Sequence, residues 1–421
     1  MKDKYLNKSI IYLFPLLMAI FLLQALGYYN VYTPWLFSFY YIIIGSICFT
    51  RIYNHRGVKM LLLLWILYII VSGLTAGLPV VYITEEFKRF IAPILFVFVG
   101  MYIKNDDLYK FFLYSIFFSV VFGFILLIFK PSWYIAFLIN CYNNLWYLNT
   151  SENANSIVQT AYRFQSFFAD SYGISYFVSF SLCIVMCDIY KKKRIIKEQR
   201  MQVVFLLAFV IAIVLSGFRV SIVYMSFMFI WMIIYGIITK NPHKSIFVGA
   251  LIASFVFVFS LALFLSDNAY FSYLKDTLFE RFSDLSIENA MEGSRTNQRE
   301  TVLASWQDVM LGDGTGSKGA QARIAGKPAI TDGGYIKMIV ENGIVGVTLF
   351  SIIIILTIWR CIKYLKYFML ELLIIGYVLV SMLGANSISM NWCFILPFWF
   401  AVGLTWNDKI LKKRIDNLEG V

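Results

Sequence analysis

The chain has little charge, little histidine and no metal-binding motif. Of its 421 residues only 14% are charged and two are histidine, whereas 60% are apolar and 19% aromatic. Ordinary globular domains carry roughly 25% charged residues, so this composition excludes that class. The mean hydropathy of +0.74 indicates a bilayer protein, because a spanning helix needs about 20 mainly apolar residues.

These shortages also limit the chemistry. The sequence has no Asp-x-Asp pair and no His/Cys cluster, so it gives no support to a metal site. The glycine-rich string at Gly312–Gly319 lacks the Gly-Lys-Ser/Thr order of a nucleotide-binding P-loop. The six cysteines fall mostly in apolar runs, and we interpret them as small hydrophobic residues, not as ligands or a disulfide. No cofactor is expected.

Apolar runs predict an all-α integral membrane protein with about 12 spanning helices. We treat residues 1–421 as a single polytopic membrane domain. The expected spans are Ile10–Tyr29, Trp35–Thr50, Met60–Leu78, Phe90–Ile103, Phe111–Phe129, Tyr172–Ile189, Val203–Gly217, Val220–Ile238, Ile246–Leu265, Tyr335–Trp359, Tyr367–Ala385 and Trp392–Trp406.

Basic residues then predict the orientation of these spans. Lys and Arg collect on alternate links, most densely at Lys191–Arg200 and in the tail Lys409–Arg414, and such links are cytoplasmic. Both termini are therefore expected to be cytoplasmic, and the first apolar run is an anchor because it lacks a signal-peptide cleavage pattern. The net charge of +12 indicates contact with anionic membrane lipids, not with nucleic acid.

Two long loops are expected on the outer face, at residues 130–171 and 266–334. His55 and His243 lie on predicted cytoplasmic links, so no histidine is expected to act in outward chemistry. The second loop is predicted to contain an amphipathic helix, Arg299–Met310, whose Trp306 packs on the membrane surface or on the helix bundle. Glycines in Gly312–Ser317 predict a turn with positive φ.

Four arginines fall on the predicted outer side: Arg163 in the first long loop, Arg219 at the mouth of a span, and Arg295 and Arg299 in the second loop. Guanidinium groups stay charged and fork onto phosphate oxygens. Several of them at one membrane surface suit a lipid-linked pyrophosphate. The alternative is that each is an interfacial anchor or the partner of a loop carboxylate, although Arg219, beside two apolar runs, favours function.

Five short motifs follow one another in the sequence: Arg163-Phe-Gln-Ser-Phe-Phe-Ala-Asp, Leu215-Ser-Gly-Phe-Arg219, Gly312-Asp-Gly-Thr-Gly, Asp332-Gly-Gly-Tyr-Ile and Glu341-Asn-Gly-Ile-Val-Gly. An outer-loop arginine precedes Trp306 and the third motif. The order and spacing of these motifs resemble the O-antigen ligase/polymerase superfamily of bacterial envelope enzymes. The resemblance implies a helical bundle of the glycosyltransferase-C kind in the bacterial plasma (inner) membrane. It also implies a metal-independent, inverting glycosyltransferase that takes glycan from undecaprenyl pyrophosphate at the outer leaflet.

Within that superfamily the sequence favours the polymerase branch, which builds O-antigen or capsular polysaccharide. The ligase branch carries a histidine where this chain has Asp332. A second departure concerns the superfamily as a whole and does not distinguish its branches: Phe218 stands where a small residue often precedes the arginine. The implied partners are undecaprenyl-pyrophosphate-linked glycans, membrane lipids and a chain-length regulator protein.

In this interpretation Arg219 and Arg299 stabilise the departing pyrophosphate, and Arg163, Arg295 and Tyr335 bind substrate. Asp332 deprotonates the acceptor hydroxyl.

Several alternatives stay open. Asp332 precedes a long apolar helix and could equally be its N-cap. Glu341 is expected to be structural, and the aromatic residues of Tyr134–Tyr162 could stack on sugars or belong to the interfacial aromatic belt. A flippase or transporter of the same lipid-linked glycan is a second class, although the sequence shows no clear internal repeat.

Overall fold

The computed structural model describes residues 32–104, 107–146, 164–166, 168, 171–190, 195–239, 243, 249, 300, 303–304, 306, 308–319, 322, 325–329, 333–383 and 395–419. Every regular element among them is an α-helix. Six of these helices are long and apolar enough to cross a membrane, and two more are shorter apolar helices. The described chain is therefore that of a helical, multi-pass membrane protein. Two of the predicted spans lie outside the described residues, Ile10–Tyr29 entirely and Ile246–Leu265 except for Gly249.

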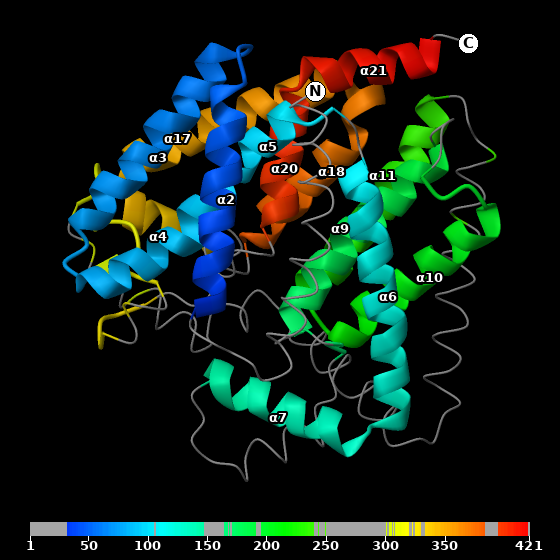
Figure 1. Ribbon diagram of the computed structural model, residues 1–421, viewed down its shortest axis with the longest axis horizontal. Helices are drawn as coiled ribbons and strands as arrows, with labels where there is room; N and C mark the ends of the chain where they lie inside the picture. The colour runs from blue at the N-terminus through cyan, green and yellow to red at the C-terminus, as the bar shows by residue number, and fades with distance from the viewer. Residues whose placement is uncertain are drawn as a thin grey trace. The chain divides into compact units, whose positions relative to one another are not determined.

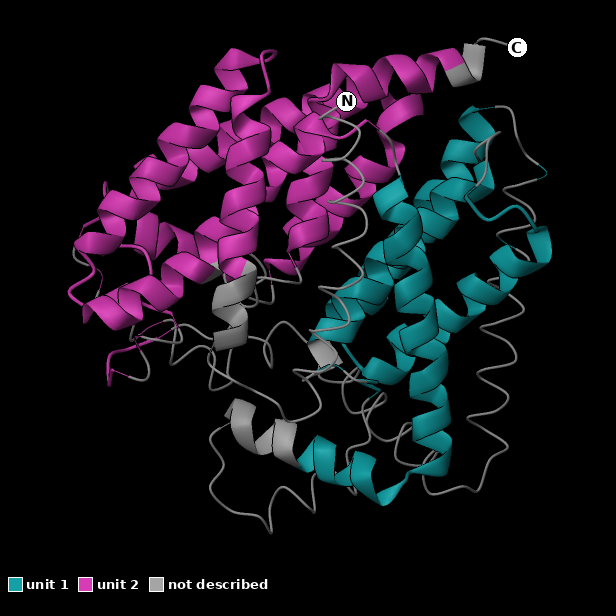
Figure 2. Ribbon diagram, viewed as in Figure 1, with its two compact units in different colours: residues 1–33, 106–285 teal, residues 34–105, 286–421 magenta. Residues whose placement is uncertain are grey.

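The chain divides into two compact units, one of Met1–Thr33 with Asp106–Leu285 and one of Pro34–Asn105 with Ser286–Val421 (Figure 2). Unit 1 contains α6 (Asp107–Phe129), α7 (Ser132–Trp146), α9 (Ser171–Tyr190), α10 (Gln199–Ser216) and α11 (Arg219–Ile238). Unit 2 contains α2 (Tyr32–Thr50), α3 (Arg56–Leu74), α4 (Val80–Ile94), α5 (Phe96–Tyr102), α17 (Gly334–Lys363), α18 (Leu365–Ser381), α20 (Leu396–Thr405) and α21 (Asp408–Glu419).

In unit 1, α9 is the central helix and packs against α6, α10 and α11 (Figure 1). It is buried along almost its whole length, although it carries small polar residues such as Ser175 and Ser179. Helix α7 lies within the segment 130–171 that we expected to be a loop. Its Tyr134, Phe137 and Leu138 pack on Leu126 of α6, so this part of the segment is an ordered helix.

In unit 2, α20 packs against α5 and α18, and α17 packs against α18 and α3. Aromatic rings fill the centre, where Trp65 of α3 lies against Phe350 and Trp399 with ring centroids 5.2 and 5.6 Å apart. These side chains come from α3, α17 and α20. Unit 2 is therefore assembled from stretches at both ends of the chain.

The single span expected at Phe90–Ile103 is wrong, because the chain forms two helices there. Helix α4 begins at Val80 and contains Pro93 near its end, and α5 follows at Phe96. The residues Glu85–Arg89, which we expected to be a polar link, lie inside α4. Hydropathy misses this helix because its charges are paired inside the protein: Lys88 pairs with Glu85, and Glu86 lies 3.9 Å from the Lys337 ammonium.

The amphipathic helix expected at Arg299–Met310 does not extend that far. Glu300, Leu303 and Ala304 are helical, but Trp306 is not, and residues 309–311 form a turn. Trp306 packs against Val340 of α17, as Ile336 does. Of the two contacts that we anticipated for Trp306, the membrane surface or the helix bundle, this is the contact with the bundle.

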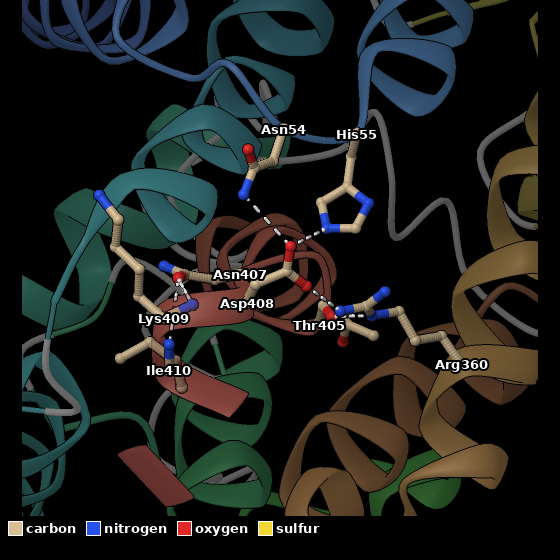
Figure 3. A network of polar contacts seen from close by, with 8 residues as sticks. All are labelled: Asn54, His55, Arg360, Thr405, Asn407, Asp408, Lys409 and Ile410. Atoms are coloured by element: carbon tan, nitrogen blue, oxygen red, sulfur yellow. Dashed lines mark hydrogen bonds and ion pairs between the residues drawn. The ribbon is translucent and has the colours of Figure 1, made fainter. Parts of the chain in front are cut away.

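A polar network joins the elements at one end of unit 2 (Figure 3). Asp408, the first residue of α21, accepts hydrogen bonds from Arg360 at 2.7 Å and from Asn54 at 3.3 Å, and its carboxylate lies 2.9 Å from His55 Nε2. The neighbouring Asn407 donates to the carbonyls of Gly100 and Ile103 at 2.9 and 2.7 Å. The predicted cytoplasmic links at both ends of the sequence thus meet at one end of this unit.

Candidate functional site

In unit 1 the candidate site is a tight turn between two apolar helices. Helix α10 ends at Ser216, Gly217 adopts a left-handed conformation with φ 65°, and Arg219 begins α11. Glycine has no Cβ and accepts this conformation without strain, so the chain reverses in three residues. The sequence predicted this turn and its position.

The motif that begins at Arg163 is hydrogen-bonded to the end of α10, directly before the same turn. The Phe164 N–H donates to the Leu215 carbonyl at 3.0 Å, and the Ser166 hydroxyl donates to the Ser119 carbonyl of α6 at 2.6 Å. Tyr134 of α7 donates from its hydroxyl to the Ser166 carbonyl at 3.1 Å. Ser166 is fully buried and has φ 50°, a conformation that costs energy for a residue other than glycine and that is frequent at functional sites.

This arrangement corrects one expectation about the aromatic residues. Tyr134 was a candidate for stacking on sugar rings, but only 4% of it is exposed and its hydroxyl supports Ser166. Its role is structural.

Arg219 lies at the mouth of a candidate span with its side chain exposed. It makes no ion pair within the part of the chain that the structure describes, and the N-cap residue of α11, Phe218, makes no side-chain capping hydrogen bond. The first turn of a helix presents backbone N–H groups and a partial positive charge. A guanidinium at that position makes this end of α11 suitable for an anion. Arg163 lies outside the described residues, next to Phe164.

In unit 2 the candidate site is a break in α17 with a loop packed into it. Gly343 is non-helical, with φ 57° and ψ −170°, and interrupts α17 (Gly334–Lys363) in its first half. A break frees backbone groups that lipid cannot satisfy. Residues 309–314 form hydrogen bonds with these freed groups. The N–H groups of Asp313 and Gly314 donate to the carbonyls of Val340 and Glu341 at 2.9 and 3.0 Å.

On the other side of the break the direction of donation is reversed. The N–H groups of Ile344 and Val345 donate to the carbonyls of Val309 and Met310 at 3.1 and 3.2 Å. Tyr68 of α3 donates from its hydroxyl toward the carbonyls of Leu311 and Asn342, at 2.6 and 2.7 Å. The loop therefore completes the hydrogen bonding of a broken helix.

The glycine loop, residues 312–319, is mostly buried, and its glycines allow that. Gly312, Gly314 and Gly316 have φ of 79°, 96° and 91°, which confirms the predicted positive-φ turn. A Cβ on Gly314 would lie 2.5 Å from the Ser72 carbonyl oxygen. The Thr315 hydroxyl donates to Asn342 Oδ1 at 2.6 Å and lies 2.7 Å from the Ser72 hydroxyl. The turn packs against α3, α4 and α17.

A cluster of buried ionic groups surrounds this loop. Lys337 has its ammonium 3.6 Å from Glu341 and 3.9 Å from Glu86, and all three residues are at most 3% exposed. The Lys318 N–H donates to Glu341 at 3.0 Å, and the Lys318 ammonium lies 3.1 Å from Asp313. Buried charges of this kind in a membrane protein are costly unless paired, and they mark functional sites.

Of the other predicted site residues, the structure describes only Tyr335. Tyr335 lies on the first turn of α17 and donates from its hydroxyl to the Leu379 carbonyl at 2.8 Å. Asp332, Arg295 and Arg299 lie outside the described residues. Helix α17 begins at Gly334 with Gly333 at its N-cap position.

Sequence reasoning missed Glu86, Lys337 and the break at Gly343. The signal for Glu86 and Lys337 was present, since each is a charged residue at the edge of an apolar run. For Gly343 the Asn-Gly pair inside a predicted span was the available signal.

No protein-family model matches the chain, and no curated protein matches it.

Proposed function

We propose that the chain is a membrane glycosyltransferase that polymerises undecaprenyl-pyrophosphate-linked oligosaccharide repeats into O-antigen or capsular polysaccharide at the outer leaflet. The observation that carries the proposal is the hydrogen bond from Phe164 to Leu215. It joins two of the motifs on which the family resemblance rests, and it does so beside the exposed Arg219 at the start of α11.

The proposed reaction is a direct displacement. A hydroxyl oxygen of the acceptor repeat attacks the anomeric carbon of the growing glycan, and the bond from that carbon to the pyrophosphate oxygen breaks. The electron pair leaves with undecaprenyl pyrophosphate, and the acceptor proton passes to the Asp332 carboxylate. A single displacement of this kind inverts the anomeric configuration.

The arginines supply the electrostatic part of this mechanism. Arg219 and Arg299 neutralise the charge that develops on the departing pyrophosphate, and Arg163 and Arg295 bind it before and after the reaction. For Arg219 the support comes from its exposure and from the N-terminus of α11, whose N–H groups favour an anion at the same place. Four fixed positive charges would make a divalent metal unnecessary.

A flippase or transporter of the same lipid-linked glycan is the second candidate, and the break in α17 favours it. Broken helices beside charged residues are typical of transporters, where they lie near the bilayer midplane. The part of α17 after Gly343 is Ile344–Lys363, which at 1.5 Å per residue is about 30 Å long and crosses the hydrocarbon core by itself. The break then lies at the membrane edge, which favours surface chemistry.

Reconstitution separates the two functions. The purified chain in vesicles, given lipid-linked repeats on its outer-facing side alone, should produce longer glycans and release undecaprenyl pyrophosphate, because a polymerase needs no transfer across the bilayer. Longer chains on the lipid carrier distinguish a polymerase from a ligase, which needs a different acceptor. Movement of unextended repeats to the opposite leaflet, with no new glycosidic bond, would refute the proposal in favour of a transporter.

A further inference from the structure

The glycine loop is attached to α17 in two different ways. Backbone hydrogen bonds join residues 309–314 to the break at Gly343, and they depend only on backbone conformation. The second half of the loop, Thr315–Gly319, lies beyond those bonds. Its attachment depends on side chains: the Thr315 hydroxyl contacts Asn342 and Ser72, and the residues after Thr315 contact the ionic cluster.

Glu341 makes the direct side-chain contact. Its Oε1 accepts the Lys318 N–H at 3.0 Å and lies 3.6 Å from the Lys337 ammonium, and only 1% of the residue is exposed. One carboxylate therefore joins the loop backbone to the first turns of α17.

Glu86 of α4 lies against the other side of the same half of the loop. A Cβ at Gly319 would lie 2.7 Å from Glu86 Oε1, and one at Gly316 would lie 2.9 Å from Glu86 Cγ. The Lys337 ammonium, 3.9 Å from Glu86 Oε2, connects this carboxylate to the one on α17. The second half of the loop thus lies against Glu86 of α4 and Glu341 of α17, and Lys337 lies within 4 Å of both carboxylates.

We infer that Glu86 and Glu341 are positioning residues that, through Lys337, lock onto α4 and α17 the glycine loop, which lies between Arg299 and Asp332 in the sequence. Neither carboxylate is assigned to the reacting atoms. The catalytic consequence of this lock rests on the proposed function, whereas the lock itself does not.

A cysteine at position 317 reports on the lock directly. Ser317 is 5% exposed, and its hydroxyl has no hydrogen-bond partner among the described residues, so Ser317→Cys replaces a hydroxyl by a thiol without breaking any contact described there. A membrane-impermeant maleimide should label Cys at this position slowly in otherwise wild-type membranes. The chain without this substitution gives the background from its native cysteines.

Adding Glu341→Ala or Glu86→Ala should increase the labelling rate at least tenfold, because the loop loses one of its two carboxylate contacts. Glu341→Gln should give an intermediate rate, since an amide oxygen still accepts the Lys318 N–H while the ionic contact with Lys337 is lost. Glu341→Gln also keeps the side-chain volume, so it serves if the alanine variant does not accumulate. Glu198→Ala and Glu198→Gln, at an exposed glutamate, are the matched controls and should leave the rate unchanged.

Polymer formation is measured in the same membranes. The expected result is that it falls in the order wild type, Glu341→Gln, Glu341→Ala as labelling rises. Unchanged labelling in the Glu341 and Glu86 variants would overturn the lock. Faster labelling with full polymer formation would overturn its catalytic consequence. An absence of polymer even in the wild-type chain would refute the proposed function, and the labelling rates would still decide the inference about the loop.

Discussion

The Phe164 N–H and the Leu215 carbonyl oxygen are 3.0 Å apart. This hydrogen bond brings the segment after Arg163 onto the turn before Arg219, although the two lie far apart in the sequence. Both are motifs of the family that the sequence resembles. Their contact is what a shared anion-binding site in unit 1 requires.

Arg219→Ala should therefore reduce polymerisation strongly. A charge-assisted hydrogen bond contributes about 1.5–3 kcal/mol, so we expect a loss of at least about tenfold, and Arg219→Lys should recover only part of it because an ammonium cannot fork onto phosphate oxygens. The measurement is the chain-length ladder in a host that makes the polysaccharide, where single repeats should accumulate. Arg200→Ala, at an exposed arginine of α10, is the control, and an unchanged ladder for Arg219→Ala would refute the assignment.

Asp332→Asn tests the proposed base. Asparagine has the same shape and caps a helix as well as aspartate does, but it cannot accept the acceptor's proton. We expect the initial rate of glycan extension to fall by about 100-fold or more, the usual range for a general base, with the amount of protein in the membrane unchanged. Wild-type rates in this variant would refute the assignment of Asp332 as the base, and helix capping would not replace it, because the N-cap position of α17 is occupied by Gly333.

Gly343→Ala should destabilise unit 2. A Cβ at this position would lie 2.4 Å from the Met310 carbonyl oxygen, and φ is 57°, so strain and overlap together should cost at least about 2 kcal/mol. The midpoint of thermal unfolding in detergent should fall. Gly57→Ala is the matched control, because nothing lies within 4 Å of its Cβ position; an equal midpoint for both variants would contradict the account of the break.

Asp408 gives unit 2 a pH dependence. Burial alone would raise the pKa of its carboxyl, but hydrogen bonds from Arg360 and His55 and their positive charge outweigh burial, so the pKa is lowered. A lowered pKa in the folded state contributes stability above the unfolded value of about 3.9, and this contribution is lost as the pH falls through the folded pKa.

Asp408→Asn should then lower stability at pH 7 by at most about 1 kcal/mol, since the side chain is 44% exposed and solvent screens it. The difference from wild type should shrink below about pH 4. Thermal midpoints at both pH values test this, with Asp416→Asn, an exposed position on the same helix, as control. A difference that stays constant down to pH 3 would contradict the prediction.

Sequence patterns predicted apolar, unbroken helices well. The span expected at Val220–Ile238 is observed as Arg219–Ile238, and that expected at Phe111–Phe129 as Asp107–Phe129. Sequence patterns failed to predict the helix α4, in which charged residues such as Glu86 are buried. Hydropathy treats Glu86 as a solvent-exposed residue, but the partner that makes its burial possible, Lys337, is distant in the sequence and is brought to it only by the packing of α4 and α17.

In the candidate sites, too, features with a local cause were predicted and features with a tertiary cause were not. The turn at Gly217 and the glycine loop follow from local backbone preferences, so the sequence predicted them. The contact of Phe164 with Leu215 and the break at Gly343 depend on tertiary hydrogen bonds. No local pattern specifies those.

The sequence order of the two units has a consequence for biogenesis. Unit 2 consists of Pro34–Asn105 and Ser286–Val421, with most of unit 1 between them. During synthesis its first helices enter the bilayer and must wait, without Trp399 to pack on Trp65 and without Asp408 to bind His55, until the last stretch of the chain has been translated. A ribosome stalled before α20 would therefore leave unit 1 fully translated and unit 2 without α20 and α21.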